Sequence, residues 1–313
     1  MTAAREPRAG VLLMTYGSPS SLDDVERYLA AVRGGRPADP DLVAEFRRRY
    51  AAIGGSPLIP ITQAQAAALE HRFDGQVLVR AAMRFSEPSV ESAIAELAKA
   101  GIESIAAIVL SPQYSPMLMG GYGRAIETAR ASIGADAPRI EVTGPWFEEA
   151  AFVDALARRI QAALDGFEPH EREAIPVLLT AHSLPLRVAR EEPDYISQLT
   201  LSAELVAAAA GLDGHRWTFC WQSAGHEPGE WMKPDFADLM PQIREAGHRS
   251  VLVAPIQFLA DHLEILYDVE IGARQQAEAV GLEFRRIASL NTDAGLIDAL
   301  EAVARRSLLT AAT

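Results

Sequence analysis

Short apolar runs alternate with amphipathic stretches along most of this chain of 313 residues. The runs that we expect to form strands occupy residues 10–16, 76–83, 104–110, 139–143, 176–181, 217–221 and 250–255. Their nearly continuous hydrophobicity is typical of parallel strands covered on both faces. The stretches with helical spacing are residues 40–53, 89–100, 152–164, 234–246 and 264–280. This alternation predicts an α/β fold with parallel sheets.

The chain also resembles itself at two constant offsets. Residues 11–19 match residues 177–185 at an offset of 166, and residues 88–110 match residues 234–256, without a gap, at an offset of 146. We interpret the matches as two lobes of similar topology. The alternative is that any two strand–helix units look alike, which leaves the α/β architecture unchanged.

The repeat divides the expected fold into an N-terminal α/β lobe, residues 1–166, and a C-terminal α/β lobe, residues 167–313. The offset of 166 aligns Tyr16 with His182, so that each residue follows the first strand of its lobe. Open α/β sheets bind ligands beyond the carboxyl ends of their strands. If the lobes face each other, Tyr16 and His182 look into one cleft from opposite sides.

A second candidate segment follows the last expected strand. Asp261, Glu264 and Asp268 are spaced i, i+3 and i+7, which predicts that the three carboxylates project from one helical face. A solvated acidic stripe with Asp261 as helix N-cap is the alternative interpretation. An imidazole and a carboxylate that converge in a cleft form either a metal site or an acid–base pair, so His182 and a carboxylate of this segment are candidates for one site. We expect His262 to face away from Glu264 and to be structural.

Charge and cysteine content narrow the function classes. A net charge of −13 argues against nucleic-acid binding, because phosphate backbones require faces rich in Lys and Arg. The single cysteine, Cys220, can form no intramolecular disulfide, which fits the cytoplasm, and cannot hold an iron–sulfur cluster by itself. No apolar run approaches the ~20 residues of a membrane span, and no export signal is expected. We therefore expect a cytoplasmic monomer without a transmembrane segment.

Five motifs, in order and at similar spacings, resemble those of the ferrochelatase family. They are residues 12–19 (LLMTYGSP), 49–57 (RYAAIGGSP), 181–185 (AHSLP), 221–225 (WQSAG) and 261–268 (DHLEILYD). The resemblance extends over residues 10–300. It implies two Rossmann-like lobes with parallel sheets that face a central porphyrin cleft, and insertion of Fe2+ into a porphyrin in haem biosynthesis. It implies no cofactor beyond the substrate Fe2+, and the single cysteine excludes the iron–sulfur cluster of some relatives.

The resemblance also assigns roles to residues. His182 and Glu264 are expected to bind the metal and accept protons on one face of the macrocycle. Tyr16 matches the position that ligates iron from the opposite face in the branch acting on coproporphyrin III, so it favours that substrate and coproheme as product. The residues expected to bind the porphyrin and its carboxylates are Arg33, Arg49, Tyr50, Ser56 and Tyr122.

Two residues depart from the family pattern. Phe85 stands where several members of this branch have histidine, so an accessory metal contact is expected to be missing. Gly272 stands where an acidic residue is often found, so we expect no metal relay along that helix. The alternatives are a protoporphyrin IX ferrochelatase giving protohaem, a chelatase for sirohydrochlorin, whose second site histidine has no counterpart at Phe85, and a non-catalytic porphyrin- or haem-binding protein.

Overall fold

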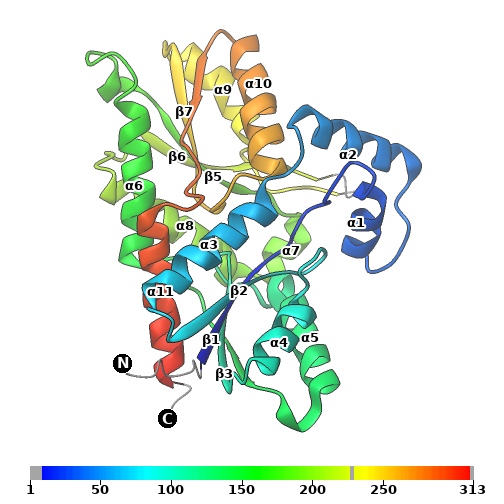
Figure 1. The fold of residues 1–313 in the computed structure, drawn as a ribbon. Coiled ribbons are helices and arrows are strands. Elements are labelled where there is room, and N and C mark those ends of the chain that lie inside the picture. Colours follow the sequence, from blue (N-terminus) through cyan, green and yellow to red (C-terminus); the bar gives the residue numbers. More distant parts are fainter. Residues whose placement is uncertain (1–8, 226–228, 311–313) are drawn as a thin grey trace. The chain divides into compact units, whose positions relative to one another are not determined.

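The computed structural model of the chain describes residues 9–225 and 229–310, which form two compact units (Figure 1). The first unit comprises Met1–Trp146 and Asn291–Thr313, and the second comprises Phe147–Leu290. The first eight residues, the last three and residues 226–228 lie outside the described part of the chain.

The first unit is built on a parallel four-stranded sheet with the strand order β2-β1-β3-β4. Its strands are β1 (Ala9–Thr15), β2 (Val77–Met83), β3 (Ser104–Val109) and β4 (Arg139–Val142). The side chains of Val11, Leu12, Leu13 and Met14 are all completely buried. Because successive side chains point to opposite faces of a sheet, burial of all four requires cover on both faces.

Helices provide that cover. α4 (Val90–Lys99) and α5 (Pro116–Ile133) pack on one face, over Leu12 and Met14. Figure 1 shows α3 (Leu58–Arg72) and α11 (Ala294–Thr310) side by side on the other face, where α3 contacts β1 and β2 and α11 contacts β3. Two helices that pack on each other, α1 (Val25–Val32) and α2 (Pro40–Ala52), precede α3, and a short 3-10 turn, η1 (Gly134–Asp136), precedes β4.

The second unit repeats this plan with a sheet of the order β6-β5-β7-β8, again parallel. Its strands are β5 (Val177–His182), β6 (Trp217–Gln222), β7 (Ser250–Pro255) and β8 (Glu283–Arg286). One face packs against α9 (Phe236–Glu245), the π-helix η3 (Glu264–Ala273) and α10 (Arg274–Ala279). The remaining helical elements are α6 (Ala150–Leu164), α7 (Leu186–Glu191), α8 (Pro193–Ala209) and the 3-10 turn η2 (Arg172–Ala174).

The α/β class and the internal repeat are both confirmed. α4 and β3 coincide with α9 and β7 at the predicted offset of 146, and the two sheets share one strand order. Every strand predicted from apolar runs is present. β8 was not predicted, because its sequence, Glu-Phe-Arg-Arg, contains one apolar residue and therefore has no hydrophobic signal.

The two compact units do not follow the division expected at residue 166. α6 packs on α8 and β7, so this helix belongs to the second unit. α11 belongs to the first unit, where Arg72 of α3 forms an ion pair with Asp298 of α11 at 2.7 Å. The expected division assumed that each lobe is continuous in sequence, whereas the C-terminal helix returns to the first unit. Within residues 9–225 and 229–310, no helix is long and apolar enough to cross a membrane.

Candidate active site

The strand orders mark one functional edge in each unit. In each unit the second strand lies on one side of the first strand, and the third strand lies on its other side. The carboxyl ends of β1 and β3, and of β5 and β7, are therefore topological switch points. Tyr16 follows β1, and Tyr122 lies in α5, the helix after β3. His182 ends β5, and Glu264 begins η3, the helix after β7. The candidate residues therefore lie where α/β folds bind ligands.

Tyr16 presents a partly exposed phenol beside two other aromatic rings. Its side chain is 42% exposed, and its ring centroid lies 5.3 Å from that of Phe85 and 6.3 Å from that of Tyr122. The backbone N–H of Phe85 donates to the Tyr16 carbonyl at 3.1 Å, which extends strand pairing past β2. Phe85, which replaces the expected histidine, thus forms one side of the Tyr16 environment.

A tight turn directly after Tyr16 directs the chain away from β1. Gly17 has φ of +86°, and a Cβ atom there would lie 2.8 Å from the Ser86 Oγ and 2.9 Å from the Ser86 Cβ. The Ser86 hydroxyl donates to the Ser18 carbonyl at 2.6 Å. Only glycine fits this combination of left-handed backbone and close approach, so Gly17 helps to set the position of the Tyr16 ring.

Arg84 lies against the same three rings and was not predicted from the sequence. Its guanidinium carbon is 4.6 Å from the Phe85 centroid, 5.5 Å from that of Tyr16 and 5.7 Å from that of Tyr122, which are cation–π distances. A Cβ atom at Gly121 would lie 1.8 Å from the guanidinium carbon, so glycine leaves the space that the side chain of Arg84 occupies. The contacts of Arg84 with Tyr16, Tyr122 and Gly121 have no sequence signal, because they join separate segments of the fold.

Tyr122 is buried behind Tyr16 and is only 2% exposed. Burial raises the pKa of Tyr122 well above its ordinary value; the nearby Tyr16 adds to this effect, and Arg84 opposes it. The phenol of Tyr122 is therefore neutral at physiological pH, and it can only donate or accept hydrogen bonds as an uncharged group.

The other expected porphyrin-binding residues lie on the segment from α1 to α3. Arg33 is exposed at the end of α1, and Ser56 lies in the turn before α3, where its Oγ accepts from the Leu58 N–H at 3.4 Å. Arg49 lies in α2, and its Nε donates to Glu45 Oε1 at 2.7 Å. Tyr50 is buried in the same helix. Hydrogen bonds from Arg48 and Arg49 lower the pKa of Glu45 to about 2, so a full negative charge already faces the Arg49 guanidinium.

In the second unit, the backbone around His182 fixes the orientation of the imidazole. Its Nδ1 lies 2.6 Å from the carbonyl oxygen of Ser183, and its backbone N–H donates to Gln257 Oε1 at 2.8 Å. The amide of Gln257 in turn donates to the hydroxyl of Tyr195. We assign the Nδ1 proton to the bond with Ser183, which leaves Nε2 with a lone pair that can accept a proton or bind a metal ion.

His262 faces Glu264, contrary to the prediction that it turns away. Its Nε2 lies 3.2 Å from Glu264 Oε2, and its Nδ1 lies 3.0 Å from the Ala260 carbonyl oxygen. When Nδ1–H donates to Ala260, Nε2 and the carboxyl oxygen form a hydrogen bond only if one proton lies between these two atoms. The prediction failed because it applied α-helical geometry to residue 262, which precedes η3.

Aromatic contacts connect this pair to His182. The Phe258 ring lies 6.3 Å from the His182 ring and 4.5 Å from the His262 ring, edge to face in both cases. The sequence predicted His182 and Glu264 as a pair, and the structure relates them through Phe258 and His262. Among the described residues, no group of three or more His, Cys, Asp and Glu side chains is arranged to hold a metal ion.

Asp261 does not belong to the acidic face predicted from the sequence. Asp261 lies before η3, and its Oδ1 accepts from the Ser289 hydroxyl at 2.7 Å and lies 3.5 Å from Arg286 Nη2. It therefore belongs to a separate ion-pair network rather than to one face with Glu264 and Asp268. The reason is that Asp261 precedes the helix, so the i, i+3 spacing of a continuous helix does not apply to it.

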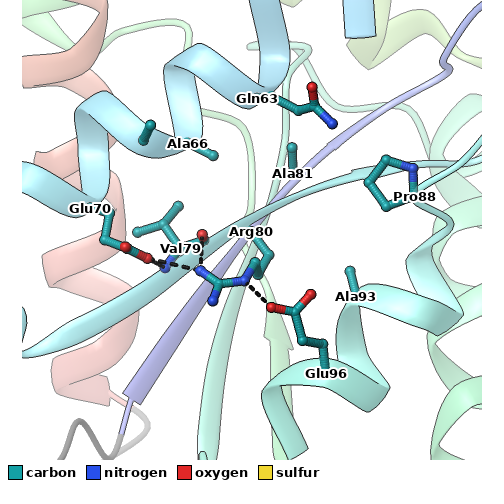
Figure 2. Close-up of a pocket in the computed structure, with 10 residues that line it drawn as sticks. Gln63, Ala66, Glu70, Val79, Arg80, Ala81, Pro88, Ala93 and Glu96 are labelled. Atoms are coloured by element: carbon teal, nitrogen blue, oxygen red, sulfur yellow. Dashed lines mark hydrogen bonds and ion pairs between the residues drawn. The ribbon is translucent and has the colours of Figure 1, made fainter. Parts of the chain in front are cut away.

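A cavity of about 290 Å³ in the first unit is lined by residues that were not predicted as part of the site (Figure 2). It borders the edge strand β2 between α3 and α4, and Arg80 lies across it. Arg80 Nη1 donates to the Val79 carbonyl at 2.9 Å and Nε donates to Glu96 at 2.6 Å, while Glu70 accepts the Val79 N–H at 2.7 Å. These side chains form hydrogen bonds with backbone groups that an edge strand would otherwise expose.

Two solved structures of SirB have a similar fold. SirB from Bacillus subtilis, solved with Fe3+, is 14% identical, covers 96% of this chain and 97% of its own, and has a TM-score of 0.58. The sirohydrochlorin chelatase SirB from Bacillus subtilis subspecies spizizenii, in complex with cobalt, is also 14% identical, with a TM-score of 0.56 and coverage of 96% and 95%. The two parallel sheets therefore define an α/β protein with the chelatase fold.

Sequence comparison identifies the family. The model of the Ferrochelatase family matches residues 8–308. Coproporphyrin III ferrochelatase from Geobacillus thermodenitrificans is 35% identical over 306 residues, which is 96% of either chain. Ferrochelatase from Deinococcus radiodurans is 35% identical over 97% of this chain and 98% of its own, and coproporphyrin III ferrochelatase from Bacillus subtilis is 34% identical over 96% and 98%. The chain belongs to the ferrochelatase family, and it is an enzyme that inserts a metal ion into a porphyrin in haem biosynthesis.

Proposed function

We propose that this enzyme inserts Fe2+ into coproporphyrin III and releases coproheme. The observation that carries the proposal is the exposed phenol of Tyr16 at the carboxyl end of β1, at the position of the axial tyrosine in the coproporphyrin branch. Two relatives that share about a third of the sequence, from Geobacillus thermodenitrificans and Bacillus subtilis, are named coproporphyrin III ferrochelatases, which supports this choice.

Metal insertion requires a proton acceptor. For each Fe2+ that enters the ring, two pyrrole N–H bonds break and two protons leave, without any change in oxidation state. We assign the first acceptor to His182, whose Nε2 retains its lone pair while Nδ1 bonds to the Ser183 carbonyl. Glu264 and His262, which share a proton position between them, form the second acceptor and the carboxylate that neutralises the incoming metal charge.

Four propionates distinguish coproporphyrin III, and they require positive or donating partners. We propose that Arg33, Arg49, Tyr50, Ser56 and Tyr122 hold the macrocycle and its carboxylates. A guanidinium has five N–H donors in a planar fork that matches a carboxylate, so Arg49 suits a propionate. Tyr16, from the first unit, would ligate the iron of the product.

The test compares two porphyrins under anaerobic conditions. Fe2+ is mixed with the enzyme and with metal-free coproporphyrin III or protoporphyrin IX, and the collapse of the Q bands is followed. We expect kcat/KM to be at least about tenfold higher with coproporphyrin III, which is about 1.4 kcal/mol of discrimination. Equal or faster insertion into protoporphyrin IX would make this a protoporphyrin ferrochelatase, and tight binding without insertion would make it a porphyrin carrier.

Histidine variants test the site in the same assay. His182→Ala should lower kcat by about 10²–10⁴-fold, the range for removal of a proton-transfer group. The control is His215→Ala, an exposed histidine in the loop before β6, which should have wild-type activity. Near-normal insertion by His182→Ala would remove it as the acceptor.

We further propose that the enzyme works in the cytoplasm as a monomer. The single buried cysteine suits a reducing compartment, since it needs no partner thiol. Sedimentation at micromolar concentration tests the oligomeric state, and a dimer mass would overturn that part of the proposal.

A further inference from the structure

The segment that carries Glu264 has an unusual backbone. η3 is a π-helix of ten residues, Glu264–Ala273, and Glu264 is its first residue. π-helices are rare and are mostly single turns inserted in α-helices, because their geometry is less favourable. A longer one persists only where the surrounding structure stabilises it. Contacts from outside the helix therefore have to hold η3 in place.

Arg286, the last residue of β8, makes such contacts with one residue before η3 and one within it. Its Nε lies 2.6 Å from Glu270 Oε2 within η3, and its Nη2 lies 3.5 Å from Asp261 Oδ1, three residues before Glu264. Its Nη1 donates to the carbonyl oxygen of Ile287 at 2.9 Å. The side chain is only 14% exposed, so solvent screens these charges little.

Both carboxylates have a second partner that completes the network. The Ser289 hydroxyl donates to Asp261 Oδ1 at 2.7 Å, and Arg274 Nη2 lies 2.5 Å from Glu270 Oε1. Arg274 Nη1 also donates to the carbonyl oxygen of Phe284 in β8, at 3.3 Å. The contacts join β8 to the loop before η3, to η3 itself and to α10, so the strand serves as a fixed base for the helix.

We propose that Arg286 is a positioning residue for metal insertion: by binding Asp261 and Glu270 on either side of Glu264, it fixes the Glu264 carboxylate against His262. The inference rests on the proposed role of Glu264. Arg286 acts through its two carboxylate partners and takes no part in the chemistry. Lysine can replace it only in part, because an ammonium group is a point charge, whereas the guanidinium fork binds both carboxylates at once.

The test measures more than stability. In Arg286→Met we expect kcat to fall by about 10–100-fold, as for other residues that orient a metal ligand, while KM for the porphyrin stays near the wild-type value. Co2+ binding to porphyrin-free enzyme, followed by d–d absorption, should weaken by a similar factor. Arg286→Lys should recover only part of the loss. Glu270→Gln should act in the same direction, and the loss in the double variant should be less than the sum of the two single losses, since both changes remove the Arg286–Glu270 contact.

The matched control is Arg285→Met, the preceding residue of β8, whose guanidinium pairs with Glu283 at 2.9 Å and should leave kcat unchanged. If Arg286→Met does not fold, Arg286→Lys and Glu270→Gln carry the test. Wild-type kcat and Co2+ binding in those two variants, or a lower melting temperature alone, would overturn the inference. Glu264→Gln distinguishes a failure of the proposed function from a failure of the role assigned to Arg286. An active Glu264→Gln enzyme contradicts the proposed function, whereas an inactive one beside fully active Arg286 variants contradicts only the role of Arg286.

Discussion

His262 Nε2 lies 3.2 Å from Glu264 Oε2, while Nδ1 of the same ring faces the Ala260 carbonyl oxygen at 3.0 Å. With Nδ1–H committed to Ala260, the other nitrogen and the carboxyl oxygen compete for one proton. The carboxyl group is therefore oriented by an imidazole that is itself oriented by the backbone. Sequence spacing alone had assigned His262 a structural role.

We expect His262→Ala to lower kcat for Fe2+ insertion by about tenfold or more, because Glu264 loses the ring that orients it. The loss should be smaller than that of His182→Ala, which removes the first proton acceptor. Initial rates at saturating Fe2+ and porphyrin measure both. His262→Asn, which keeps a polar group of smaller reach, should have an intermediate rate. A wild-type rate in His262→Ala would mean that Glu264 works without this contact.

Tyr16→Phe tests the proposed axial ligand. Removal of the phenol oxygen should shift the visible absorption of the bound product, because the iron loses an oxygen ligand, while kcat should fall less than in His182→Ala. Phe85→Leu is the matched variant, since it removes the ring that packs at 5.3 Å but leaves the phenol in place. An identical product spectrum for Tyr16→Phe and wild type would exclude Tyr16 as a ligand.

Glu270 should contribute to stability in a pH-dependent way. Burial alone would raise the pKa of Glu270, but hydrogen bonds from Arg274 and Arg286 outweigh it and hold the pKa below the ordinary value of 4.5. A carboxyl whose pKa is lower in the folded chain stabilises the fold above its unfolded pKa, and this contribution is lost as the pH falls through the folded pKa. Wild type should therefore lose unfolding free energy below about pH 4.5 more steeply than Glu270→Gln.

Urea midpoints between about pH 5 and pH 3 measure that slope. Glu278→Gln is the control, because Glu278 is an exposed residue of α10 and its removal should leave the slope unchanged. Parallel pH profiles for wild type and Glu270→Gln would contradict the prediction.

Arg80→Ala should make the protein more prone to associate through β2. The guanidinium occupies the Val79 carbonyl oxygen and pairs with Glu70 at 3.0 Å, so its removal exposes part of an edge strand (Figure 2). Sedimentation velocity should show a stronger concentration dependence than for wild type. Arg130→Ala, which breaks a surface pair with Glu127 on α5, should behave as wild type. Identical sedimentation of Arg80→Ala and Arg130→Ala would show that Arg80 does not protect the edge.

The fold was predictable because buried parallel strands leave a direct sequence signal. β1 and β5 are continuous apolar runs, and their ends located Tyr16 and His182 without further information. Residues whose role depends on contacts between distant segments were not predictable. Arg84 and Gln257 each bind partners from another segment, and β8, which carries Arg286, has no apolar pattern.

The remaining errors concern the segment around η3. Sequence patterns are read with 3.6 residues per turn, and nothing in residues 264–273 signals a wider turn. Asp261 and His262 also precede η3, so helical spacing did not describe their relation to Glu264. The sequence therefore predicted a helix after β7 but gave the wrong relations of Asp261 and His262 to Glu264.

The return of α11 to the first unit has a consequence for biosynthesis. A ribosome makes β1 to β4 early, yet the helix that packs on β3 and α3 emerges only after the whole of Phe147–Leu290. The second unit is thus complete in sequence while the first still has an apolar face without its final cover. Incomplete chains expose this apolar face until α11 has been synthesised. We therefore expect the nascent first unit to be the part that depends on chaperones.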